Sequence, residues 1–178
     1  MSVIIRNLQS KIQLNLSQLH YDAVTLLKLT QYHSYDLGIM LVSSNEIKAL
    51  NKKYRRVNRV TDVLAFPFLE VSHEQPGVLP NVDQEDRMLG DIALCTSFIW
   101  SESQKHKEDF NSVMLTMVTH GLCHLVGFDH ETKDQWTQMY RKELEILTRF
   151  NQLTGYRCSP LLGVGHFEAQ PLLSDQTH

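Results

Sequence analysis

The sequence has few cysteines, no long apolar run and little excess of charge of either sign. Its 178 residues include only Cys95, Cys123 and Cys158. An odd count without regular spacing excludes a disulfide-stapled secreted scaffold and indicates a reducing compartment. No apolar stretch is long enough to span a bilayer, and we expect neither membrane insertion nor a secretory signal.

The overall charge does not favour binding to phosphate. The formal net charge is -3 and the sequence pI is about 6.3, so a nucleic-acid partner needs a local basic patch. The N-terminal segment has no acidic residue before Asp22 and carries Arg6 and Lys11, which is a weak sign of a mitochondrial presequence. Residues 3–5 also read as the first strand of the fold. These residues therefore leave localisation open between the mitochondrion and the cytoplasm.

Apolar spacing predicts a single α+β domain, and 42% hydrophobic residues suffice for its core. The segments expected to be strands are 2–8, 37–42, 61–68 and 89–94. Five helices are expected. The first begins near residue 16, the second opens with a capping box at 43–46, and the third runs from about 95 to about 107. The fourth runs from about 111 to about 126, and the fifth begins with a cap at 132–135. Pro67 should end its strand or confine it to a sheet edge. Residues 70–87 read as a long loop, and 159–178 as a flexible tail after a domain of residues 1–158.

Three histidines have the spacing of a metal site. His120 and His124 lie one helical turn apart on one face, Gly127 can end that helix in a left-handed conformation, and the chain can then return with His130. Imidazole ligands favour one zinc ion, although iron, nickel or copper also fit, and three protein ligands leave a position open for water. Cys123 should point to another face of the helix. Five histidines without motif spacing are expected to be surface or loop residues, with closure of the metal site by one of them as the alternative: His33, His73, His106, His166 and His178.

The spacing is that of the metzincin protease motif with one letter changed. Gly121 stands where those proteases carry the glutamate that acts as general base. A metal can lower the pKa of water without that carboxylate, whereas expulsion of an amine leaving group needs a proton shuttle. A phosphodiester substrate therefore fits better than a peptide. Asp129 is either a base, a group that hydrogen-bonds to a metal ligand and orients it, or a plain turn residue.

A basic segment offers contacts for a phosphate backbone. The residues concerned are Lys52, Lys53, Tyr54, Arg55, Arg56 and Arg59. Cations around an aromatic side chain are typical of surfaces that bind single-stranded nucleic acid. Lysine and arginine also favour the last turn of a helix for electrostatic reasons alone. Together with a metal site, RNA binding becomes the better explanation.

These motifs resemble the YbeY family of metal-dependent endoribonucleases, from the start of the chain to the helix near residue 150. The matching segments are Tyr54-Arg55, Thr61-Asp62-Val63-Leu64-Ala65-Phe66-Pro67, Leu89-Gly90-Asp91-Ile92 and Thr119-His120-Gly121-Leu122-Cys123-His124-Leu125-Val126-Gly127-Phe128-Asp129-His130. Residues 2–9 and 119–125 look most like the animal members, which act in mitochondria. Ala65 departs from the family, in which many members carry serine.

The resemblance implies a zincin-like α+β fold with a small mixed sheet, and zinc held by His120, His124 and His130. It also implies a functional arginine at Arg55. Single-stranded RNA would be the substrate, in the maturation of small-subunit ribosomal RNA and in contact with a small-subunit ribosomal protein. Arg55, His120 and His124 are thus the expected catalytic residues.

Three functions compete on these grounds. The first is a single-strand-specific metallo-endoribonuclease, in which Arg55 binds the scissile phosphate. The second is a ribosome-assembly factor whose zinc is structural. The third is a metallopeptidase that uses another base, such as Asp129, and Gly121 makes it the least favoured.

Overall fold

The fold is built on a four-stranded mixed sheet. A computed structural model describes residues 1–161, and its strands lie in the order β1-β2-β4-β3. Their bounds are β1 Val3–Asn7, β2 Asp36–Val42, β3 Val63–Pro67 and β4 Met88–Cys95. The strands β1, β2 and β4 are parallel, whereas β3 runs antiparallel to β4 at one edge. Pro67 ends this edge strand, as predicted, because proline cannot donate to a sheet ladder.

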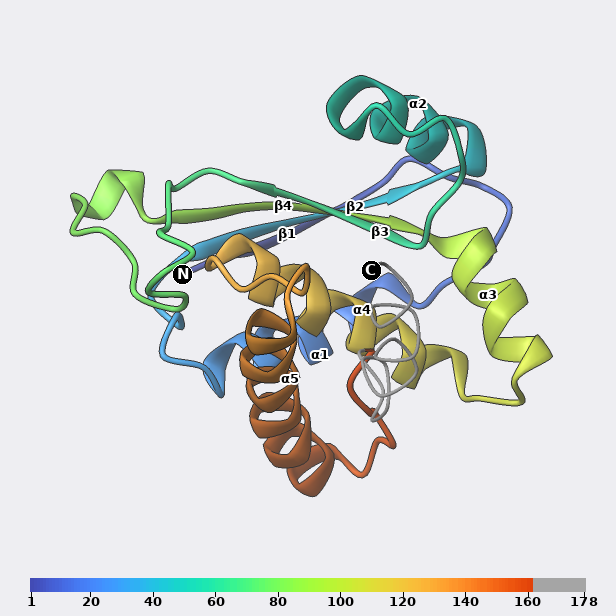
Figure 1. The fold of residues 1–178 in the computed structure, drawn as a ribbon. Coiled ribbons are helices and arrows are strands. Elements are labelled where there is room, and N and C mark those ends of the chain that lie inside the picture. The colour runs from blue at the N-terminus through green and yellow to red at the C-terminus, as the bar shows by residue number, and fades with distance from the viewer. Residues whose placement is uncertain (162–178) are drawn as a thin grey trace, which may run out of the picture.

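The helices lie unevenly on the two faces of the sheet (Figure 1). Their bounds are α1 Leu16–Lys28, α2 Ser44–Arg55, α3 Thr96–Lys105, α4 Phe110–Leu125 and α5 Lys133–Thr154, with a short 3-10 turn at Gln84–Asp86. One face carries α4 and α1, with α5 packed against both of them, and α2 covers the opposite face. The predicted α+β class with about five helices is therefore confirmed.

Side chains that alternate along β4 contribute to two hydrophobic cores, one on each face of the sheet. Ile92 packs with the α4 side chains, whereas Ala93 joins Ile47 of α2 on the other side. Successive strand residues point to opposite faces, so one strand serves both layers. The helix α4 is buried over most of its length because the sheet, α1 and α5 surround it. A helix held on several sides is a rigid support for functional side chains.

Both predicted capping boxes are present. The Ser43 side chain accepts from the N–H of Glu46, whose carboxylate accepts from the N–H of Ser43. Thr132 and Gln135 make the same reciprocal pair at the start of α5. Such caps satisfy N–H groups that a helix leaves unbonded, and they fix where α2 and α5 begin.

The long loop at 70–87 folds against the C-terminal end of α4. Gly77 donates its N–H to the carbonyl of Val126 at 2.8 Å, and Tyr32 donates its hydroxyl to the carbonyl of Gly77 at 3.0 Å. Gly127 has φ 97, and a Cβ there would lie 2.6 Å from Cγ1 of Val71. The loop thus supports the turn that ends the metal-site helix.

The chain after α5 returns to the body of the fold. Tyr156 donates its hydroxyl to the buried carboxylate of Asp22 at 2.6 Å, and Asn151 bonds both backbone groups of Cys158. The flexible tail that we predicted falls mostly on residues 162–178, which lie outside the described residues. Within the described part of the chain, no helix is long and apolar enough to cross a membrane.

Candidate metal centre

The helix α4 and the turn after it bring the three predicted histidines together. His120 and His124 project from the last two turns of α4, with their Nε2 atoms 3.1 Å apart. The left-handed Gly127 then reverses the chain, so that the His130 ring centroid lies 5.5 Å from that of His120 and 5.0 Å from that of His124. One ligand nitrogen from each residue falls within a group no wider than 4.8 Å.

The outward-facing nitrogens of two of these rings are already engaged. Nδ1 of His120 lies 2.8 Å from Oε1 of Glu143, and Nδ1 of His124 lies 3.0 Å from the carbonyl oxygen of Phe128. Carboxylate and carbonyl oxygens accept, so each Nδ1 carries the proton and each Nε2 presents a lone pair to the centre. This tautomer is the one that a metal ligand needs.

The electrostatics of the centre keep these rings neutral. Burial, followed by repulsion from the nearby His130, lowers the pKa of His120 to about 4. Burial, followed by repulsion from His120 and His130, lowers the pKa of His124 to about 3. Two uncharged imidazoles, close together and with little water around them, suit a cation better than a proton.

The donor set fits zinc. Zinc–nitrogen bonds of about 2.0–2.1 Å in tetrahedral geometry place ligand nitrogens about 3.3 Å apart. The observed 3.1 Å between Nε2 of His120 and Nε2 of His124 agrees with that spacing. His120, His124 and His130 would therefore hold such an ion with at least one position left for water or substrate. The same three nitrogens also suit other imidazole-binding metals.

The histidines lie in a cavity of about 650 Å³ that Arg55 also lines. Arg55 comes from the last turn of α2, on the opposite face of the sheet, and reaches the cavity at the edge strand β3. Its Nη2 donates to the carbonyl of Ala65 at 2.8 Å, and its guanidinium lies over the Phe66 ring at 5.7 Å from the centroid. These contacts hold a cation beside the metal centre. A larger hollow of about 840 Å³ adjoins this cavity but contains none of the three histidines.

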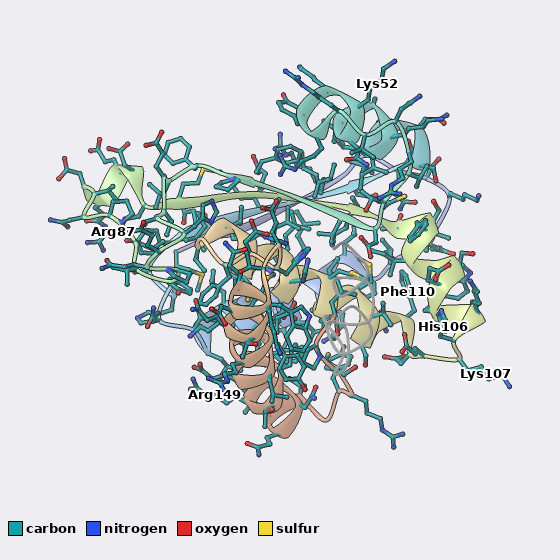
Figure 2. All side chains as sticks on the ribbon, in the orientation of Figure 1. Lys52, Arg87, His106, Lys107, Phe110 and Arg149 are labelled. Atoms are coloured by element: carbon teal, nitrogen blue, oxygen red, sulfur yellow. The ribbon has the colours of Figure 1, made fainter. Side chains whose placement is uncertain are left out.

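The rest of the basic segment is not in the cavity. The lining includes Arg55 but none of the other residues that we predicted to bind RNA: Lys52, Lys53, Tyr54, Arg56 and Arg59. All five are exposed, at the end of α2 or in the loop after it. Figure 2 shows Lys52 pointing away from the sheet. The structure thus separates one arginine at the centre from a basic surface outside it.

Asp129 faces the cavity of the metal centre, whereas Gly121 lies against the sheet. Asp129 lines the cavity, and its Oδ1 accepts the N–H of its neighbour His130 at 2.8 Å, so it is both a turn residue and a group near the centre. Gly121 faces the sheet: a Cβ there would lie 2.8 Å from Cγ2 of Ile92. A glutamate at this position would meet the core, which explains in steric terms why the protease base is absent.

One residue near the centre was missed by the sequence analysis, and a second was noted only as a surface or loop histidine. Glu143 is fully buried and holds His120, although it lies 23 residues away on α5. Its only signal was a carboxylate within the apolar stripe of that helix, where a charge is costly unless it is paired. His73 was expected to be a surface or loop residue; it is exposed in the loop at 70–87, but it also lines the cavity. Cys123 is buried in the core, away from the ligand group, as expected.

Comparison with known proteins agrees with this geometry. The family model described as Endoribonuclease YbeY matches residues 4–151. The human protein of that name is 40% identical over 162 residues, which cover 90% of this chain and 95% of the human protein. The Clostridioides difficile protein of the same name is 30% identical over 155 residues, 85% of this chain and 97% of that protein. A solution structure from Thermotoga maritima is similar at a TM-score of 0.51 and 25% identity, covering 85% of this chain and 93% of the other.

Proposed function

The chain belongs to the YbeY family of endoribonucleases, and from that premise we propose that it cleaves single-stranded RNA with a metal ion held by His120, His124 and His130. The observation that carries the proposal is the shared cavity. It joins three imidazoles to one guanidinium, Arg55, across the edge strand of the sheet. A phosphodiester needs both kinds of group, because its oxygens carry charge that increases during cleavage.

Each residue has a distinct role in this proposal. Arg55 binds the non-bridging oxygens of the scissile phosphate through its planar donors. The ion would supply a Lewis acid for the phosphate and lower the pKa of water. We propose zinc because three histidines with an open position are its usual catalytic set. Asp129, at the rim of the same cavity, accepts a proton or orients the ligand turn.

Single-stranded RNA suits the surface around the centre. The exposed cations Lys52, Lys53, Arg56 and Arg59 follow α2 and its C-terminal loop, and they can track a backbone without reading its sequence. Tyr54 packs edge-on against Phe66, with ring centroids 5.1 Å apart, and remains half exposed for base stacking. These groups would bind RNA, whereas only Arg55 would contact the reacting phosphate.

We propose small-subunit ribosomal RNA as the substrate, with a small-subunit ribosomal protein as partner, in mitochondria. The support is the likeness to a human YbeY protein and the N-terminal segment with Arg6 and Lys11 but no acidic residue before Asp22. Residues Val3–Asn7 form β1 and pair with β2, so targeting would have to leave this segment in place. Fractionation of cells that express the tagged chain, followed by crosslinking to RNA, tests the location and the substrate together.

An RNA-cleavage assay of the wild type and three variants tests the proposed activity. Wild type, Arg55→Ala, His124→Ala and Arg56→Ala should be purified in parallel, analysed for metal, and incubated with one RNA in single-stranded and duplex form. We expect the wild type to cleave the single strand and Arg56→Ala to cleave it with a raised KM but an unchanged kcat. Arg55→Ala should retain metal but lose activity, and His124→Ala should lose both. Equal cleavage by all four would identify a contaminating nuclease and refute the assignment. A protein with full metal content and no cleavage would favour the assembly factor with a structural zinc.

A further inference from the structure

Another, smaller cavity lies where three chain segments leave the sheet. The strands β1, β2 and β4 are parallel, so their carboxyl ends meet at one edge, where α2 and α3 begin (Figure 1). This junction pocket has a volume of about 240 Å³. It is lined by Gln9, Ser10, Lys11, Val42, Ser43, Ser44, Asn45, Thr96 and Ser97. It shares no lining residue with the metal-centre cavity.

The two helices that begin at the junction pocket differ in their caps. Ser43 and Glu46 satisfy the start of α2 with a full capping box. At the start of α3, Cys95 holds the N-cap position and makes no side-chain capping bond. The first N–H groups of a helix have no partner within it and carry partial positive charge, so an uncapped start attracts an anion.

A buried hydroxyl of a residue that lines the pocket also has no partner. Thr96 is 0% exposed, lines the pocket, and its Oγ1 makes no hydrogen bond. Such groups are rare in native proteins, because burial removes water without replacing it. The structural alternative is that the hydroxyls of the pocket serve only as caps. This explains Ser43 but not Thr96, which lies beyond the N-cap of α3, in its first turn.

The charge of the lining has one sign. Among the described residues that form the junction pocket, Lys11 is the only charged one, and the remaining polar groups are hydroxyls and amides. Ser44 and Ser97, one from each helix, approach to 3.0 Å between their Oγ atoms. Hydroxyl donors, free backbone N–H groups and one lysine are the groups that bind phosphate in proteins.

We propose that the junction pocket binds a phosphate group, through the first N–H groups of α3, the hydroxyls of Thr96 and Ser97, and Lys11. The phosphate could belong to an RNA backbone or to a free phosphate or mononucleotide, which share this chemistry. The site does not depend on RNA cleavage, because none of its residues belongs to the metal centre.

The test is an NMR titration of the full, metal-loaded chain with inorganic phosphate. Phosphate at millimolar concentration should shift the backbone amides of Thr96, Ser97 and Phe98 in a saturable manner. Lys11→Glu should weaken binding by about tenfold or more, because it replaces an attractive charge by a repulsive one. Lys28→Glu is the matched control, since it makes the same charge change outside the pocket and should bind as the wild type does.

Thr96→Val examines the hydroxyl separately. Its Oγ1 makes no hydrogen bond in the free protein, so the substitution should leave thermal unfolding nearly unchanged while weakening phosphate binding. Adenosine monophosphate and an uncleavable 2′-O-methyl oligonucleotide identify the source of the phosphate. Tighter saturation by the oligonucleotide assigns an RNA backbone, and saturation by the small anions alone assigns a free phosphate or nucleotide.

Absence of shifts at residues 96–98 with every probe would overturn the proposal. Equal affinities for Lys11→Glu and Lys28→Glu would overturn it as well. If an Arg55→Ala protein loses RNA cleavage while its residues 96–98 still shift with phosphate, the phosphate-site proposal stays intact. The two proposals can therefore fail independently of each other.

Discussion

Glu143 and His120 form a buried pair in which Oε1 of Glu143 lies 2.8 Å from Nδ1 of His120. Their side chains are 0% and 7% exposed. The pair fixes the tautomer and the orientation of one metal ligand from a different helix, and a carboxylate in this position increases the basicity of the other ring nitrogen. The metal centre thus depends on the packing of α5 against α4.

The first prediction concerns this pair. Glu143→Gln keeps the shape and an acceptor for the Nδ1–H but removes the charge, so metal affinity should fall by about 10–100-fold. Competition with a chromophoric chelator measures the affinity. Glu145→Gln is the matched control, because Glu145 is exposed two residues further along α5 and contacts only the surface Lys142 among the ion pairs of the described chain. Equal affinities in the two variants would contradict the role of the buried carboxylate.

The second prediction is that the metal-free protein loses stability in mild acid. The folded-state pKa values, about 4 for His120 and about 3 for His124, lie below the ordinary 6.5. At pH values between about 4 and 6.5, the unfolded chain binds more protons at these two histidines than the folded chain does. The free energy of unfolding therefore decreases as the pH falls below 6.5. Urea denaturation of chelator-treated protein across this range measures the slope.

His124→Gln provides the comparison for that slope. It removes one of the two imidazoles whose pKa is lowered in the folded protein, and the decrease in stability with falling pH should become shallower. Zinc-loaded wild type should resist acid to a lower pH than the metal-free protein, because the bound ion opposes protonation of its ligands. An identical slope for the metal-free wild type and His124→Gln would show that other groups control the acid response.

Local signals in the sequence were sufficient for most of the fold. The capping boxes at Ser43 and Thr132 located two helix starts to within a residue, and Pro67 located the end of an edge strand. Helical spacing also brought His120 and His124 to one face. Each of these depends on residues a few positions apart, where backbone geometry alone decides which side chains meet.

What the sequence could not show depends on tertiary packing. Glu143 reaches His120 only because α5 docks on α4, and no short-range pattern encodes that contact. The basic segment looked uniform in sequence, yet a helix distributes neighbours around its axis, so Arg55 enters the cavity and Lys52 points to solvent. The loop at 70–87 read as polar chain, and its bond from Gly77 to Val126 involves only backbone atoms.

The third prediction compares two left-handed glycines. Gly127→Ala should destabilise the protein by about 1–2 kcal/mol for the backbone conformation alone, with a further cost because the new Cβ would lie 2.6 Å from Cγ1 of Val71. Gly155 has φ 80, and a Cβ there would meet no atom within 4 Å, so Gly155→Ala should show only the backbone cost. Thermal unfolding measures both.

Metal affinity separates the two glycines further. Gly127 lies three residues before His130 and sets the direction of the ligand turn, whereas Gly155 ends α5. We expect Gly127→Ala to weaken metal binding and Gly155→Ala to leave it unchanged. If both variants bound metal equally well, the turn would not be what places His130.

The last prediction concerns the shape of the cation beside the metal centre. Arg55→Lys keeps the charge but loses the planar donors, one of which reaches the carbonyl of Ala65 while the guanidinium lies over Phe66. A lysine cannot make both contacts and also donate hydrogen bonds to two phosphoryl oxygens. The value of kcat/KM for RNA should therefore fall by about 10–100-fold while metal content is unchanged. Arg56→Lys makes the same change at an exposed residue outside the cavity and should cleave as the wild type does. Retained activity in Arg55→Lys would mean that Arg55 supplies only a diffuse positive charge and that the phosphate is oriented by other groups.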